Sequence, residues 1–68
     1  MRPEIEDARV KATNVLRASG LSEDGIAAWW RGLSSYLDDQ SPADVILCDP
    51  DWVIGAAIDT VAEMQGNK

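Results

Sequence analysis

Apolar residues in this chain recur at steps of three and four positions, and no segment alternates apolar and polar residues over a useful length. Steps of three and four place side chains on one face of an α-helix, whereas a half-buried strand would alternate. The pattern therefore predicts an all-α protein without a sheet, folded as a small compact bundle of four to five short helices.

The first predicted helix is amphipathic and covers residues 1–20. Pro3 suits its first turn, acidic residues follow at its positive end, and Gly20 is a natural left-handed stop. Its inward stripe consists of Ile5, Ala8, Ala12, Val15, Leu16 and Ser19.

A second helix is predicted to begin after Ser22, whose hydroxyl can cap the first free N–H groups. Gly32 is expected to fray or end this helix, and a turn-rich connection follows with Tyr36 and Leu37 as expected core residues. The apolar members of the helix are Ile26, Ala27, Trp29, Trp30 and Leu33.

Two Pro residues mark two further helix starts, Ser41-Pro42 and Asp49-Pro50. Pro fits the first helical position, and the residue before Pro disfavours helical backbone, so the first of these helices is short. Cys48 is interpreted as a small core hydrophobe rather than a reactive thiol. The last helix is predicted to run to about residue 64, with an inward stripe of Val53, Ala57, Thr60, Val61 and Met64, widened by Ile54 and Ile58.

A length of 68 residues limits the chain to one domain, residues 1–68, with residues 66–68 expected to form a flexible tail. Twelve acidic residues face six basic residues, a net charge of −6, and there is no His. An acidic surface repels phosphates, so direct nucleic-acid binding is disfavoured. There is no long uncharged apolar run and no N-terminal signal core, so we expect no membrane span and a cytoplasmic location.

The acidic pairs are the first candidates for chemistry, namely Asp38-Asp39 and the pair Asp49 and Asp51. Catalytic or metal-binding carboxylates must converge in a cleft, whereas each of these residues has a simpler role in a cap or a turn. Without His, the commonest general base is missing as well. We therefore predict no enzyme activity, no cofactor and no metal site.

The tryptophans point to protein binding. Trp29 and Trp30 are about 100° apart on one helix, so both cannot point fully inward, and we expect one in the core and one partly exposed. Trp52 falls outside the stripe of the last helix. Exposed Trp residues often anchor protein interfaces, although a small domain can also use Trp to fill its core. Trp30 and Trp52 are the candidate anchors.

The segment "VLRASGLSEDGIAAWW" resembles a helix-turn-helix, and a small transcriptional regulator is therefore one alternative. The would-be recognition helix begins with Glu23 and Asp24, which oppose contact with phosphates. A basic stripe would have to come from Arg9, Lys11, Arg17 and Arg31. A structural dimerisation module, in which the Trp residues mediate self-association, is the other alternative.

Residues 26–64, "IAAWWRGLSSYLDDQSPADVILCDPDWVIGAAIDTVAEM", resemble the toxin-binding domain of Xre/MbcA/ParS-type antitoxins. Trp29 or Trp30 matches the Trp of that domain, and Leu37 matches the Leu before its turn. Ser41-Pro42, with Asp44, Val45 and Ile46, matches the capped helix; Val53, Ala56 and Ala57 match the last helix. The resemblance covers roughly residues 21–65, while the usual N-terminal helix-turn-helix domain is replaced by one helix. The family's Gly-rich turn is replaced by Asp38-Asp39-Gln40.

The resemblance implies a protein of a bacterial or phage toxin–antitoxin system that neutralises its toxin by steric occlusion. Such antitoxins cap RES-type toxins, which consume NAD, and their C-terminal region covers the route to the NAD site. Carried over to this chain, the protein-binding surface includes the Trp52 end of the last helix and the tail residues Gln65, Asn67 and Lys68.

Overall fold

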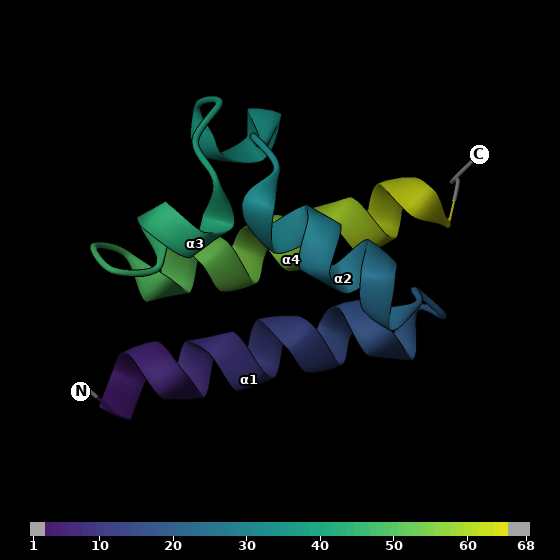
Figure 1. Cartoon of the computed structure of the whole chain (residues 1–68), viewed down its shortest axis with the longest axis horizontal. Helices are drawn as coiled ribbons and strands as arrows, with labels where there is room; N and C mark the ends of the chain where they lie inside the picture. The colour runs from purple at the N-terminus through teal and green to yellow at the C-terminus, as the bar shows by residue number, and fades with distance from the viewer. Residues whose placement is uncertain (1–2, 66–68) are drawn as a thin grey trace.

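The computed structural model describes residues 3–65, and Figure 1 shows them as a small assembly of helices. Over this range the elements are α1 (Pro3–Ala18), α2 (Glu23–Arg31), the 3-10 helix η1 (Ser35–Leu37), α3 (Pro42–Val45) and α4 (Pro50–Met64). The predicted all-α class is confirmed. Within residues 3–65 the pairing of extended segments is limited to one antiparallel bridge between Ser34 and Gln40. No helix in this range is both long and apolar enough to cross a membrane.

The predicted helix ends are confirmed in most details. Gly20 lies in the turn that follows α1 and has a φ of +97°, a backbone conformation that residues with a Cβ rarely adopt. The Ser22 hydroxyl accepts the N–H of Gly25 at 3.1 Å, and the Asp49 carboxylate accepts the N–H of Trp52 at 3.3 Å. Local capping chemistry therefore sets where α2 and α4 begin.

The start of α3 uses its polar residues differently. The Ser41 hydroxyl donates to the Asp44 carboxylate at 3.0 Å instead of accepting a backbone N–H. Pro42 occupies the first turn and is buried, so the ring also contributes to packing.

The core lies mainly where α1 runs along α4, which is the most extensive contact between two helices in the described range (Figure 1). Small residues on the facing sides, among them Ala12, Ala56 and Ala57, allow the two helices to approach closely. The buried apolar residues are Ile5, Ala8, Ala12, Leu16, Ile26, Leu37, Val45, Ile46, Val53, Ala56 and Ala57.

The interpretation of Cys48 as a core residue is wrong, because its side chain is exposed. Successive residues on a helical path turn by about 100°, so a run of four apolar residues cannot all face one way. Val45 and Ile46 take the inward positions, and Leu47, which is 58% exposed, and Cys48 turn outward.

Leu33 was expected on the apolar face of the second helix, but it is 77% exposed. The reason is Gly32, whose extended backbone (φ −81°, ψ 158°) ends α2 one residue earlier. The chain then leaves the helical path, and position 33 no longer falls on the inward face.

A tight turn follows η1. The N–H of Gln40 donates to the carbonyl of Leu37 at 3.1 Å, and the two residues between them, Asp38 and Asp39, both have positive φ values of 56° and 61°. This is the pattern of a primed turn, in which Gly or Asn is the favoured residue. The turn lets the fully buried Leu37 anchor the connection between α2 and α3.

Candidate protein-binding groove

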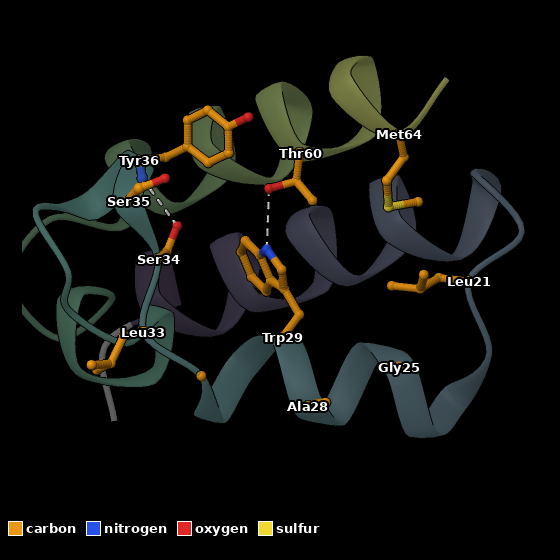
Figure 2. Close-up of a pocket in the computed structure, with 11 residues that line it drawn as sticks. Leu21, Gly25, Ala28, Trp29, Leu33, Ser34, Ser35, Tyr36, Thr60 and Met64 are labelled. Carbon is orange, nitrogen blue, oxygen red and sulfur yellow. Dashed lines mark hydrogen bonds between the residues drawn. The ribbon is translucent and has the colours of Figure 1, made fainter. Parts of the chain in front are cut away.

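An apolar groove of about 450 Å³ lies between α2, the connection at residues 33–36 and α4. Figure 2 shows this groove, with Trp29 in its middle, Leu21 and Met64 at one end and Leu33 at the other. We call it the Trp29 groove. Its lining residues are Leu21, Gly25, Ala28, Trp29, Gly32, Leu33, Ser34, Ser35, Tyr36, Thr60 and Met64.

Trp29 reaches from α2 toward α4 and forms the centre of the groove (Figure 2). Its indole N–H donates to the Thr60 hydroxyl oxygen at 3.2 Å, and the Thr60 hydroxyl donates in turn to the Ala56 carbonyl at 2.8 Å. The polar edge of the ring is therefore satisfied within the protein. Its apolar surface remains available to a ligand, which is the arrangement typical of Trp at interfaces.

The α2 side of the groove carries mostly small residues beside Trp29. Gly25, Ala28 and Gly32 follow one another at steps of three and four residues, so they lie on one face of the helix. None of the three has a side chain larger than a methyl group. A partner could therefore come close to the backbone of α2 at Ala28 and Gly32. At Gly25 the Leu21 side chain already lies against the helix, since a Cβ at this position would stand 3.1 Å from the Leu21 Cγ atom.

Tyr36 forms part of the opposite wall. Its hydroxyl donates to the Glu63 carboxylate, and its backbone N–H donates to the Ser34 hydroxyl oxygen at 3.3 Å. The hydrogen bond to Glu63 raises the pKa of Tyr36 above its usual range, with smaller contributions from burial and from the charges of Glu63 and Asp59. None of the described residues that line the groove is charged, and the Glu63 carboxylate lies beside its Tyr36 wall.

Trp30 lies on the side of α2 that faces α1. Its indole N–H donates to the Thr13 hydroxyl oxygen of α1 at 3.3 Å, and the Arg9 guanidinium lies 5.8 Å from the ring centroid. The rings of Trp29 and Trp30 meet edge to face, with centroids 5.2 Å apart. Both tryptophans are partly buried, so the expectation of one core Trp is wrong. The indole N–H of Trp30 is directed to α1 and that of Trp29 to α4, and neither ring is fully buried.

The residues predicted to bind a partner do not form one surface within the described range. Trp30 packs toward α1, Trp52 is 37% exposed in the first turn of α4, and the exposed Gln65 follows the end of α4. Trp52 and Gln65 are thirteen positions apart along α4, which corresponds to about 20 Å. Asn67 and Lys68 lie outside the described residues.

Sequence reasoning missed the residues that form the groove. Met64 and Thr60 were assigned to the inward stripe of the last helix, but Met64 is exposed and both line the groove. The available signal was the spacing of Gly25, Ala28 and Gly32 beside Trp29, which leaves a bulky ring next to a face of small side chains.

The acidic residues do not gather into a metal site, since no group of three or more His, Cys, Asp or Glu within residues 3–65 could hold a metal ion. A second concavity of about 320 Å³ lies between α1 and the start of α4. It is lined by acidic residues such as Asp7 and Asp51, and by Lys11, whose ammonium is 3.6 Å from the Asp7 carboxylate. Its charged residues are thus partly paired with one another.

The cations that would have to form a DNA-binding stripe are mostly paired with acids. Arg17 donates two hydrogen bonds to Glu23, at 2.9 and 3.1 Å, and this contact lowers the pKa of Glu23. Arg9 lies 3.9 Å from Glu6, in addition to the Lys11 pair. The carboxylates thus interrupt the positive charge along α1 and at the start of α2.

Comparison of the chain with protein-family models, with curated proteins and with solved structures finds no match.

Proposed function

We propose that this chain is a small cytoplasmic protein-interaction module, similar to an antitoxin, that binds a toxin and neutralises it by steric occlusion. The observation that carries the proposal is the Trp29 groove. It combines an aromatic centre whose N–H is satisfied with exposed apolar residues at both ends, Leu33 and Met64. Grooves of this kind bind protein segments, because aromatic and apolar anchors supply most of the energy of an interface.

The class of partner follows from the resemblance of residues 21–65 to antitoxin toxin-binding domains. It suggests a RES-type toxin that consumes NAD, encoded next to this chain. The net charge of −6 fits a protein that reaches a basic partner through electrostatic attraction. It disfavours the alternative of a DNA-binding regulator, as does the pairing of Arg9, Lys11 and Arg17 with carboxylates.

The test is rescue from toxicity. The product of the neighbouring gene is expressed in a bacterial host with and without this chain, and growth and cellular NAD are measured. We expect co-expression to restore both, and the two proteins to co-purify as a complex. A neighbouring product that is harmless, or toxicity that persists with the chain present at equal or higher level, would contradict the proposal.

Matched variants locate the binding surface. Leu33→Ser alters the groove, while Leu47→Ser alters an exposed leucine at the end of α3 that does not line the groove. Leu33→Ser should weaken rescue and binding, and Leu47→Ser should leave both unchanged.

Trp52→Ala tests the anchor predicted from the sequence. If Trp52 is an anchor, this change weakens binding more than stability; a loss on the scale of core aromatics, about 3–5 kcal/mol, would instead make Trp52 a structural residue.

A further inference from the structure

The shape and charge of the Trp29 groove restrict the segment that it can hold. We infer that the groove accepts a short amphipathic helix of the partner protein, with one apolar face and Lys or Arg residues beside that face. This inference rests on the proposed function, because it names the part of the partner that the groove would bind.

A helix fits the groove better than an extended segment. A β-strand peptide binds by adding to an exposed sheet edge, and the main walls here are the helices α2 and α4, whose N–H and C=O groups are mostly bonded within each helix. The small side chains on this face of α2 suit a second helix, which can approach most closely at Ala28 and Gly32, since small residues permit the closer interaxial distances of about 8 Å.

The length of that face sets the size of the segment. Gly25 and Gly32 are seven residues apart, which corresponds to about 10 Å along α2, or two helical turns. A partner helix would therefore present apolar residues at positions i, i+3 or i+4, and i+7. These would contact the Trp29 ring in the middle and Leu33 and Met64 at the ends (Figure 2).

The charges of the described residues around the groove favour a basic segment. On the α4 side, Glu63 accepts the Tyr36 hydroxyl and Asp59 lies close enough to influence the same group. On the α2 side, the exposed Asp24 precedes Gly25. Arg31, next to Gly32, is the one cation beside the described lining residues of α2, so carboxylates outnumber cations.

The same charges argue against a second copy of this chain as the occupant. Two copies that each carry a net charge of −6 repel one another, and the apolar ends of the groove would have to overcome that repulsion. A basic segment instead gains attraction as it approaches.

The inference is tested with three synthetic peptides of 14 residues and the isolated chain. The first peptide is an amphipathic helix of Leu, Ala and Lys with Leu on one face, the second has Glu in place of Lys, and the third is a scrambled form of the first without an apolar face. Binding is followed by tryptophan fluorescence and by NMR shifts of backbone amides. We expect the first peptide to bind, with shifts at Gly25, Ala28 and Gly32, and the other two to bind about tenfold or more weakly.

A matched pair of alanines provides the control. Ala28 lines the groove, and Ala62 is exposed on α4 outside it. Both positions are helical and tolerate Gln, so Ala28→Gln and Ala62→Gln should fold equally well, as circular dichroism and thermal melting would verify. Ala28→Gln should weaken the first peptide about tenfold, whereas Ala62→Gln should leave its affinity unchanged.

Equal binding of the first and scrambled peptides, or shifts confined to residues outside the groove, would overturn the inference. An experiment that contradicts this inference can be told apart from one that contradicts the proposed function. Rescue from toxicity by wild type and by Ala28→Gln alike, without peptide binding, removes the inference and leaves the function in place. Selective peptide binding without any rescue supports the inference and removes the antitoxin function.

Discussion

Helix α4 takes part in two contacts that differ in kind. Toward α1 it presents Val53, Ala56 and Ala57, which are buried in the core, and the two helices close upon each other. Toward α2 it presents Thr60 and Met64, and the indole of Trp29 stands between the helices. Small residues on both partners close an interface, whereas a bulky ring beside small residues of the same helix leaves a groove.

This contrast separates stability from recognition. The α1–α4 contact buries the apolar surface on which a domain of 68 residues depends, and such a domain has little stability to spare. The α2–α4 contact buries less apolar surface, and Leu33 and Met64 beside it stay exposed. Substitutions in the first region should therefore change folding, and substitutions in the second should change binding.

The largest effect is expected for Leu16→Ala. Leu16 is 0% exposed on the α1 side of the core, so its truncation removes buried surface and leaves a cavity. We expect a loss of about 2–5 kcal/mol in the free energy of unfolding, measured by urea denaturation. Leu33→Ala, at a position 77% exposed, should change it by less than about 0.5 kcal/mol. Similar losses for both leucines would mean that the two regions do not differ as described.

A smaller effect is expected when the same bulk is added to each region. Ala57 is 0% exposed against α1, so Ala57→Leu should overpack the core and cost about 1–3 kcal/mol. Ala28→Leu enters the open groove, and we expect a change within about 0.5 kcal/mol together with weaker peptide binding. Thermal melts of the two variants against wild type provide the measurement. A destabilised Ala28→Leu variant would show that the groove is already filled.

The smallest effect is expected at the exposed corner between α1 and α2. The hydrogen bonds from Arg17, followed by its charge, lower the pKa of Glu23 in the folded protein. A lowered folded-state pKa contributes stability that is present above the usual carboxyl pKa and is lost as the pH falls through the lowered value. Glu23→Gln should therefore melt slightly below wild type at neutral pH, and the difference should shrink between about pH 5 and about pH 3. A difference that stays constant over this range would contradict the assigned ion pair.

Part of the candidate site could be predicted from the sequence. The spacing of apolar residues predicts both helices that form the groove, and the capping residues Ser22 and Asp49 locate their starts. The exposure of Trp52 fits its place outside the apolar stripe. The groove could not be predicted, because Thr60 and Met64 lie on the edge of a stripe whose far limit depends on how much of α4 the neighbouring helices cover.

The sequence by itself therefore determined the helices, their ends and the acidic surface, since these depend on periodicity, capping and charge within a few residues. The outward turn of Cys48 and the different hydrogen-bond partners of the Trp29 and Trp30 indoles were decided only by the tertiary structure. Each depends on where a second helix packs, and the residues next to these positions in the sequence carry no information on the place of that helix. Trp29 became the centre of a groove because α2 lies beside both α1 and α4, with the indole N–H of Trp30 directed to α1 and that of Trp29 directed to α4.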